Sequence, residues 1–360
     1  MTESFLPQVN GVTNSVLRVC EQLAQRQHDV MVVAPGPGPT EYCGFPVIRT
    51  PSVPLPGYRE FRLARPYAGL RGLLTDYKPD LVHLASPAVL GAQAAYNAHR
   101  LGIPIIAVYQ TDLAGFARRY HLGMTEDAVW RYLRKIHGAA ARTLAPSRHS
   151  VEQLESIGIE RVKRWARGVD LKRFHPRHRD ETWRRRHAQS GEVLVGYVGR
   201  LAHEKDVALL SSLQAVDNIR VVIAGDGPAR KQLERQLPNA EFLGFRSGPE
   251  LSKTFASLDL FVHTGPHETF CQAAQEALAS GVPVVAPAAG GLLDLVDPGK
   301  TGALFRPGDG IGLALRVHDL ASDPTLRHAM GVQARRSVEG RSWNVIGDEL
   351  VRHYQEVLAA

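Results

Sequence analysis

The sequence predicts an α/β protein made of two doubly wound domains. Short β-branched apolar runs alternate with helical stretches, and the alternation stops at a polar segment, residues 172–189, and then restarts. The length of 360 residues suits two cores of ~150 residues each better than one core. We therefore expect domains at residues 1–168 and 191–341, a linker at 169–190 and a C-terminal helix at 342–360 that crosses back to the first domain.

The strands expected in the first domain are near-continuous apolar runs, as buried parallel strands are. They are predicted at residues 30–34, 81–84 and 103–108, with helices at 14–27 and 86–101 between them. A strand ordinarily comes before the first loop of such a domain, but this sequence opens directly on a loop at residues 4–11. We expect that strand to be missing and the true start of the reading frame to lie upstream.

The second domain repeats the pattern. Strands are predicted at residues 193–198, 221–224, 260–262 and 284–286, and an apolar helix at 270–280 ends before Gly281. Two domains of this kind are expected to face each other across a cleft, with the loops at the carboxyl ends of the strands carrying the ligand-binding side chains.

Composition excludes several classes of protein. Hydrophobic residues make up 44% of the chain and charged residues 22%, which are globular proportions. No apolar run approaches the ~18–20 residues of a membrane span, and the first residues do not read as an export signal. The three cysteines, which are far apart, do not form a disulfide framework. We expect a cytoplasmic protein.

The net charge of +7 is unevenly distributed. Residues 1–170 carry +6, residues 171–187 carry +5 and residues 188–360 carry −4. A basic first half suggests an anionic partner, which leaves nucleic acid, an anionic membrane and phosphorylated ligands open. Nucleic acid is disfavoured because aromatic residues are only 7% of the chain and no groove-reading motif is present.

Two glutamates, Glu268 and Glu276, stand at the predicted apolar helix of the second domain. Eight helical residues would separate them by ~12 Å, roughly the span from a ribose to a sugar across a diphosphate. Apolar neighbours predict that Glu276 is buried, and ribose hydroxyls would satisfy its carboxylate. The free N–H groups expected at the helix start belong to Thr269, Phe270 and Cys271, and they suit an anion or a sugar. A helix cap with an internal salt bridge is the alternative.

Two cations follow the strand at residues 193–198. Arg200 and Lys205 share one loop and suit a diphosphate, although ordinary surface basic residues would look the same. Gly225 and Asp226 begin a tight turn at the same expected edge, and Gly11, preceded by Asn10, could let backbone approach a phosphate.

Several ligand motifs are absent. There is no Asp-x-Asp to hold a divalent ion under a diphosphate, no Cys-x-x-Cys, no Gly-x-Gly-x-x-Gly after a strand and no phosphate-binding loop of the Gly-x-x-x-x-Gly-Lys-Ser/Thr type. We therefore expect no metal site, no resident cofactor and no dinucleotide.

Together these motifs resemble those of the retaining family 4 glycosyltransferases of the GT-B fold, over nearly the whole chain. The pattern Glu268…Glu276, the segments 277–284 and 290–302 and the loops at 198–205 and 224–228 carry the resemblance. More narrowly, the segments 2–12, 108–112 and 165–170 resemble actinobacterial GDP-mannose-dependent α-mannosyltransferases, which make mannosylated glycolipids. Sulfoquinovosyl diacylglycerol synthases share much of the first loop.

The resemblance implies a role for each donor-side residue. Arg200 and Lys205 would neutralise the diphosphate, Glu276 would bind the ribose, and Glu268 with the N–H groups of Phe270 and Cys271 would hold the sugar. Gly11 would let its loop close on the phosphate, and the turn containing Phe245 and Arg246 would lie near the base. The implied reaction retains the anomeric configuration and needs no metal. The full donor-binding set is Gly11, Gly225, Asp226, Phe245, Arg246, Glu268, Thr269, Phe270, Cys271 and Glu276.

On the acceptor side, many relatives have a histidine where this chain has Gln110, and an amide cannot act as an acid or base. We therefore assign Asn10, Tyr109, Gln110 and Asp112 to positioning the sugar or acceptor. A catalytic role for Asp112, beside Arg200, Lys205 and Glu268, is a further hypothesis.

A basic and apolar segment, residues 58–71, includes Arg59, Arg62 and Arg65. This region meets the membrane in lipid-modifying relatives, so the resemblance implies contact with an anionic membrane at its cytosolic face, where a lipid acceptor would lie. A solvated surface is the alternative. The resemblance implies a mannosyltransferase that uses GDP-mannose and a lipid-linked acceptor. A transferase that uses a UDP-sugar, or a nucleotide-sugar epimerase of the same architecture, is the alternative.

Overall fold

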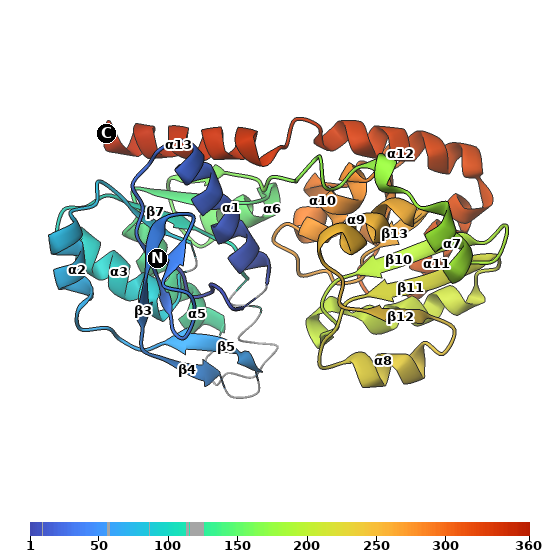
Figure 1. Ribbon diagram of the computed structural model, residues 1–360, viewed down its shortest axis with the longest axis horizontal. Coiled ribbons are helices and arrows are strands. Elements are labelled where there is room, and N and C mark those ends of the chain that lie inside the picture. Colours follow the sequence, from blue (N-terminus) through green and yellow to red (C-terminus); the bar gives the residue numbers. More distant parts are fainter. Residues whose placement is uncertain (9, 56–57, 86, 113–114, 116–125) are drawn as a thin grey trace. The chain divides into compact units, whose positions relative to one another are not determined.

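The computed structural model describes residues 1–360 except 9, 56–57, 86, 113–114 and 116–125, and of residues 55 and 58–61 it describes only the backbone. The chain divides into two compact α/β units, in agreement with the predicted fold class (Figure 1). Unit 1 contains Met1–Arg167 and Trp343–Ala360, and unit 2 contains Gly168–Ser342.

Unit 1 contains two small sheets, with β1, β3 and β2 in one and β6, β7, β8 and β9, all parallel, in the other. An antiparallel hairpin of β4 and β5 lies beside them. The described strands are β1 (Val32–Pro35), β2 (Glu41–Tyr42), β3 (Phe45–Thr50), β4 (Ser52–Leu55), β5 (Tyr58–Ala64), β6 (Val82–Leu84), β7 (Ile105–Val108), β8 (Arg142–Ala145) and β9 (Val162–Arg164). The described helices are α1 (Gly11–Gln25), α2 (Leu70–Tyr77), α3 (Val89–Arg100), α5 (Glu126–Gly138), α6 (Arg148–Ser156) and α13 (Trp343–Leu358).

The first two residues lie between the two sheets of unit 1. The N–H group of Thr2 donates to the carbonyl of Val33 in β1 (3.0 Å), and the N–H group of Ala85, just after β6, donates to the carbonyl of Met1 (2.9 Å). Met1 and Thr2 therefore bridge β1 and β6, at the place where the sequence predicts a missing strand.

The C-terminal helix α13 returns to unit 1, as the sequence predicts, and packs against α1 (Figure 1). Trp165 is buried there, and its Nε1–H group donates to the carbonyl of Ile346 (3.0 Å). Arg26 at the end of α1 forms an ion pair with Asp348 (2.5 Å). Apolar packing and these polar contacts together fix α13 on unit 1.

Unit 2 is built on one parallel sheet with the strand order β12-β11-β10-β13-β14-β15. Its strands are β10 (Val193–Val198), β11 (Ile219–Ala224), β12 (Glu241–Gly244), β13 (Leu260–Val262), β14 (Val284–Pro287) and β15 (Gly302–Phe305). Its α-helices are α7 (Glu181–His187), α8 (Arg230–Gln236), α9 (Gly248–Ser257), α10 (Gln272–Ala279), α11 (Gly310–Ser322) and α12 (Pro324–Val338). Its 3₁₀ helices are η1 (Pro176–His178), η2 (His203–Lys205), η3 (Val207–Ala215) and η4 (Gly290–Asp294).

The strand order reverses between β10 and β13. From β10 the chain proceeds through β11 to β12 on one side, and from β13 through β14 to β15 on the other. The loops that follow β10 and β13 therefore diverge at this point, which is where ligands bind in open α/β sheets. The topology thus predicts a ligand site at the two loops that contain Arg200, Lys205 and Glu268.

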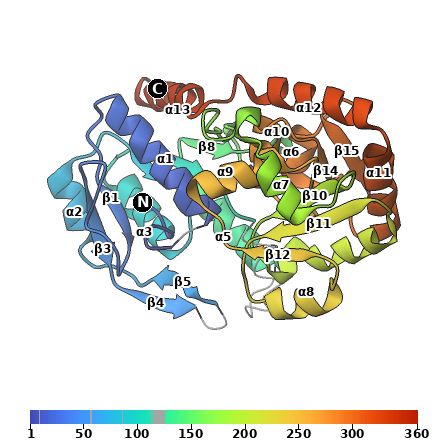
Figure 2. The same ribbon diagram turned by 45° about the vertical axis from the view of Figure 1, so that its right-hand side comes forward.

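Helices cover both faces of this sheet (Figure 2). Leu260 and Val262 of β13 share a buried cluster with residues of α11, whereas Phe261 between them packs against Phe255 of α9 (5.8 Å between ring centroids). Successive side chains of a strand point to opposite faces, so α9 and α11 lie on opposite sides of the sheet. Both faces are buried, and the strands accordingly read as continuous apolar runs.

The segment at 169–190, for which the sequence predicts a linker, packs on unit 2 and contains η1 and α7. Trp183 of α7 is buried, and Arg184 forms an ion pair with Asp259 (2.7 Å). Charge pairing to unit 2 explains why so polar a segment is ordered there. Within the described part of the chain, no helix combines the length and the apolar character that a bilayer crossing requires.

Candidate functional site

An ion pair joins the two loops at the reversal point of unit 2. Nζ of Lys205, at the end of η2, lies 2.5 Å from Oε1 of Glu268, in the loop after β13. The hydroxyl of Thr264 donates to the carbonyl of Lys205 (2.7 Å) and ties the same loops together. The structure therefore brings together two of the residues that the sequence assigns to the diphosphate and the sugar.

Backbone packing holds these loops close to their neighbours. A Cβ atom at Gly225, whose φ is +148°, would lie 1.9 Å from the carbonyl oxygen of Gly199. A Cβ atom at Gly291 would lie 2.5 Å from Cα of Phe270, and the Gly291 N–H group donates to the carbonyl of Glu268 (2.7 Å). Glycine is required at both positions because a side chain would push the loops apart.

The charges at the ion pair stabilise each other. Burial alone would raise the pKa of Glu268, but Lys205 and His263 outweigh it and hold the pKa below its usual value. Burial alone would lower the pKa of Lys205, but the Glu268 carboxylate raises it above its usual value. Both groups are therefore charged near neutral pH, and the site presents an ammonium beside an acceptor carboxylate.

Helix α10 begins later than the sequence predicts. It starts at Gln272, not at residue 270, because Cys271 adopts the left-handed conformation (φ 77°) and occupies the N-cap position. Glu268 therefore lies before the helix, and the premise that all the residues from Glu268 to Glu276 are helical is wrong. Glu276 lies on α10 but is half-buried, so its predicted burial is also wrong. The unpaired N–H groups of the first turn begin at Gln272.

The other predicted donor-side residues lie on neighbouring loops of unit 2. Arg200 is half-buried, 3.5 Å from the carboxylate of Glu204. Asp226 is exposed and forms an ion pair with Arg230 (3.1 Å). Phe245 is 62% exposed, which is unusual for a residue with a large aromatic side chain and suits stacking on a base. Arg246 beside it and Thr269 before α10 are half-buried.

In unit 1, Asn10 caps helix α1. Its Oδ1 accepts hydrogen bonds from the N–H groups of Val12 (3.0 Å) and Thr13 (2.9 Å), and its Nδ2 donates to Oγ of Ser4 (2.7 Å). Gly11 is exposed as the first residue of the helix. The side chain of Asn10 thus shapes the loop, while the first turn at Gly11 is open to a ligand.

Gln110 is fixed by a buried arginine. Its Nε2 donates to the carbonyl of Ala85 (2.6 Å), and its Oε1 accepts a hydrogen bond from Arg167 (2.8 Å), whose other terminal nitrogen donates to the carbonyl of Gly11 (2.9 Å). Arg167 is only 8% exposed. It therefore joins Gly11, a predicted donor-binding residue, and Gln110, a predicted acceptor-side residue, in one network.

The two remaining acceptor-side residues differ in their surroundings. Tyr109 is fully buried and stacks on Trp130 (6.5 Å between centroids), so it is a core residue in this structure. Asp112 is half-buried, and its Oδ1 accepts a hydrogen bond from the N–H group of Gly115 (2.9 Å).

Sequence reasoning missed Arg167 and His263. Arg167 meets Gln110 across 57 positions of sequence, a contact that no local pattern reveals. His263 follows β13 directly, is 3% exposed and places Nε2 at 3.1 Å from Oε1 of Glu268. Burial alone would lower the pKa of His263, but the Cys271 thiol and the Glu268 carboxylate raise it above its usual value. The spacing His263-x-x-x-His267 was a signal in the sequence that could have found it.

The predicted membrane residues lie on hairpin β4–β5 and just after it. Arg62 is half-buried, and its Nε donates to the carbonyl of Gly36 (2.8 Å) and to Oγ of Ser52 (2.9 Å). Arg65 is exposed. The side chain of Arg59 lies outside the described part of the chain.

Two family models together match most of the chain. The model described as Glycosyltransferase Family 4 matches residues 9–173, and the model described as Glycosyl transferases group 1 matches residues 179–337. The boundary between the matches lies close to the boundary between units 1 and 2.

Curated relatives match over nearly the full length. The chain is 48% identical to a GDP-mannose-dependent alpha-mannosyltransferase of Mycobacterium tuberculosis, over 99% of this chain and 96% of that protein. It is 45% identical to a protein of the same name from Corynebacterium glutamicum, over 100% and 88% of the two chains. It is 33% identical to the sulfoquinovosyl transferase SQD2 of Arabidopsis thaliana, over 93% and 68%.

Among solved structures, Anabaena Alr3699/HepE in complex with UDP superposes with a TM-score of 0.82, over 99% of this chain and 98% of that chain. The two are 19% identical, so this likeness concerns the fold. WaaG, a glycosyltransferase involved in lipopolysaccharide biosynthesis, superposes with a TM-score of 0.73 at 17% identity and 98% coverage of both chains.

Proposed function

The chain belongs to the family 4 glycosyltransferases, and on that premise we propose that it transfers mannose from GDP-mannose to a lipid-linked acceptor. The observation that carries the proposal is 48% identity over 99% of the chain to a mannosyltransferase that depends on this donor. The proposed reaction retains the anomeric configuration and needs no metal ion. It takes place in the cytoplasm, at the inner face of the cell membrane.

The residues of unit 2 support donor binding in this scheme. Lys205 and Arg200 carry the positive charge that a departing diphosphate requires. The Glu268 carboxylate and the N–H groups before and at the start of α10 take the sugar hydroxyls, and Glu276 takes the ribose. Phe245 is exposed and available to the base.

The reaction balances without a metal. An acceptor hydroxyl oxygen forms a bond to C1 of mannose on the face that the diphosphate leaves, while the bond from C1 to the β-phosphate oxygen breaks. The hydroxyl proton passes to the departing diphosphate, which Lys205 and Arg200 keep neutralised. In unit 1, Gln110 and Asp112 position the acceptor or the sugar, and Gly11 lets its loop close on the donor phosphate.

A panel of nucleotides tests the donor. In the presence of EDTA, we expect GDP and GDP-mannose to raise the Tm, while UDP, ADP and UDP-glucose leave it within the scatter of the assay. At ~100 times Kd the stabilisation is about 2.7 kcal/mol, a shift of several degrees.

Each of the other outcomes of this panel would contradict a different part of the proposal. A preference for UDP would contradict the GDP-mannose assignment and favour a UDP-sugar transferase, which the 33% identity to SQD2 makes the second candidate. Stabilisation that depends on added metal would contradict metal independence. Conversion of GDP-mannose to another nucleotide sugar without an acceptor would identify an epimerase.

Membrane contact is tested on Arg65, because the hydrogen bonds of Arg62 hold the hairpin. We expect Arg65→Glu to weaken binding to phosphatidylglycerol-containing vesicles about tenfold or more, since each basic residue near an anionic surface contributes ~1 kcal/mol and charge reversal doubles the change. Arg100→Glu on α3 makes the same charge change at another exposed site and should bind normally. Equal vesicle binding by both variants and the wild type would refute contact through Arg65.

A further inference from the structure

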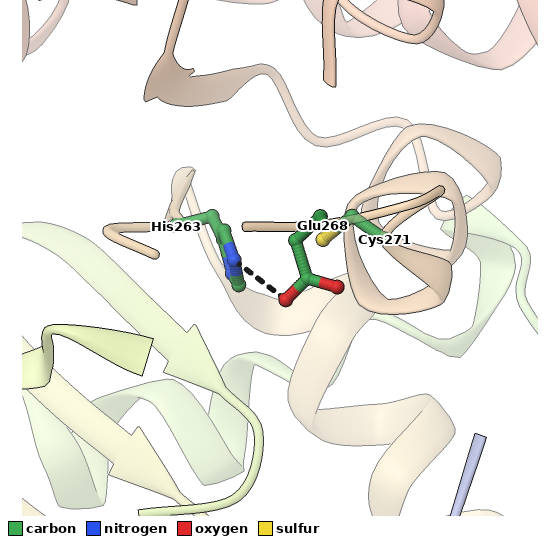
Figure 3. Close-up of side chains that lie close together, drawn as sticks. All are labelled: His263, Glu268 and Cys271. Atoms are coloured by element: carbon green, nitrogen blue, oxygen red, sulfur yellow. Dashed lines mark ion pairs between the residues drawn. The ribbon is translucent and has the colours of Figure 1, made fainter. Parts of the chain in front are cut away.

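Three side chains with metal-binding atoms gather at the start of α10 (Figure 3). One ring nitrogen of His263, one carboxylate oxygen of Glu268 and Sγ of Cys271 all lie within 4.8 Å of one another. His263 and Cys271 are 3% and 5% exposed. Among the described residues, no other three His, Cys, Asp or Glu side chains bring their ligand atoms this close together.

The donor atoms match the preferences of Zn²⁺. Nitrogen, oxygen and thiolate sulfur bind this ion at ~2.0–2.3 Å with tetrahedral angles, which places ligand atoms roughly 3.3–3.8 Å apart. The Nε2 to Oε1 distance is already 3.1 Å. Convergence on one ion requires only small side-chain movements.

The cluster is held in place, and His263 meets Glu268 in an ion pair (3.1 Å) and not in a well-aligned hydrogen bond. Among the described residues, neither ring nitrogen of His263 has a hydrogen bond of good geometry, although the ring is buried. Tyr197 stacks on the ring at 13° and fixes its plane. Cys271 is held in the left-handed region at φ 77°, a conformation costly for a side chain and often found at functional sites.

We propose that His263, Glu268 and Cys271 form an inhibitory binding site for a thiophilic divalent cation such as Zn²⁺. The ion replaces the Lys205 ammonium, which lies 2.5 Å from the same carboxylate oxygen, and its binding releases the protons of the His263 ring and the Cys271 thiol to solvent. Lys205 has a flexible four-carbon stem and can turn away when the cation enters. The site shares Glu268 with the proposed donor site and differs from it in having a thiolate ligand.

Inhibition follows from the sharing of Glu268. A carboxylate bound to a metal ion no longer accepts hydrogen bonds from sugar hydroxyls, so Zn²⁺ should weaken the binding of a nucleotide sugar more than that of the nucleotide alone. This consequence rests on the proposed function, whereas metal binding is measured on the protein alone. Failure of one is therefore distinguishable from failure of the other.

Co²⁺ titration of the full-length protein tests the site, because a cobalt–thiolate bond has a characteristic charge-transfer absorption. We expect the band in the wild type, and its loss in Cys271→Gly and His263→Gln. Glycine suits the backbone of position 271 and keeps the fold. Cys43→Ser and Cys20→Ser remove an exposed and a buried thiol elsewhere and should keep the band. Absence of the band in the wild type, or its retention in Cys271→Gly, would overturn the proposal.

Lys205→Ala provides a test in the opposite direction. Removing the competing ammonium should tighten Zn²⁺ binding by about tenfold or more, since a like charge a few ångströms from the ion disfavours it. A merely adventitious site elsewhere would not respond. Calorimetry with Zn²⁺ on the wild type, on Lys205→Ala and on the control Lys253→Ala measures the effect. If Lys205→Ala bound Zn²⁺ no more tightly than the wild type, competition at Glu268 would be refuted.

Discussion

Replacement of Glu268 by glutamine is expected to lower kcat/KM for the sugar donor by about 10²–10³-fold, the effect of losing one well-placed transition-state contact. The amide has the shape of the carboxylate but no charge. It can no longer pair with Lys205 at 2.5 Å or with His263 at 3.1 Å, and its NH₂ group would repel the ammonium. Steady-state kinetics with GDP-mannose measure the loss.

Binding measurements separate the role of Glu268 from that of Glu276. Glu268→Gln should weaken GDP-mannose binding while GDP binding changes less than about threefold, because GDP has no sugar. Glu276→Gln should weaken both ligands alike, because both contain the ribose. Glu250→Gln on α9 changes an exposed glutamate of the same unit and should have no effect. If Glu268→Gln weakened GDP as much as GDP-mannose, Glu268 would not be the sugar ligand.

The strands that could be predicted from the sequence are those that burial on both faces makes continuous apolar runs. The predicted range 260–262 coincides with β13, and 193–198 coincides with β10. Strands with one polar face escaped prediction. β12 (Glu241–Gly244) begins with a glutamate, and β5 (Tyr58–Ala64) mixes charged and apolar residues and belongs to a hairpin outside the two parallel sheets.

Of the candidate site, the sequence could predict only those residues that directly follow the end of a strand. Arg200, Lys205 and Glu268 follow β10 and β13, and the chain topology brings those ends together. The late start of α10 could not be predicted, because the left-handed backbone of Cys271 depends on the packing around it. The link between Arg167 and Gln110 likewise exists only after β7 and the segment beyond β9 have folded.

The role of Lys205 leads to a second large effect. Lys205→Ala and Arg200→Ala are each expected to reduce kcat by about 10²–10³-fold, because negative charge grows on the diphosphate as the bond to C1 breaks. Lys205→Arg should not restore the rate, since a planar guanidinium does not fit where a compact ammonium lies 2.5 Å from Glu268. Single-turnover rates at saturating donor isolate this step from binding.

A double variant shows whether the two cations act on one group. If Arg200 and Lys205 neutralise the same diphosphate, the double alanine variant should lose much less than the product of the single losses, because residues that act as a unit are not additive. Lys253→Ala removes a lysine of similar exposure from α9 and should keep the wild-type rate. Fully multiplicative losses would place the two cations on different groups. A rate within about threefold of wild type in Lys205→Ala would remove Lys205 from the proposed chemistry, because a transition-state charge of this kind is stabilised by ~2.7–4 kcal/mol per contact.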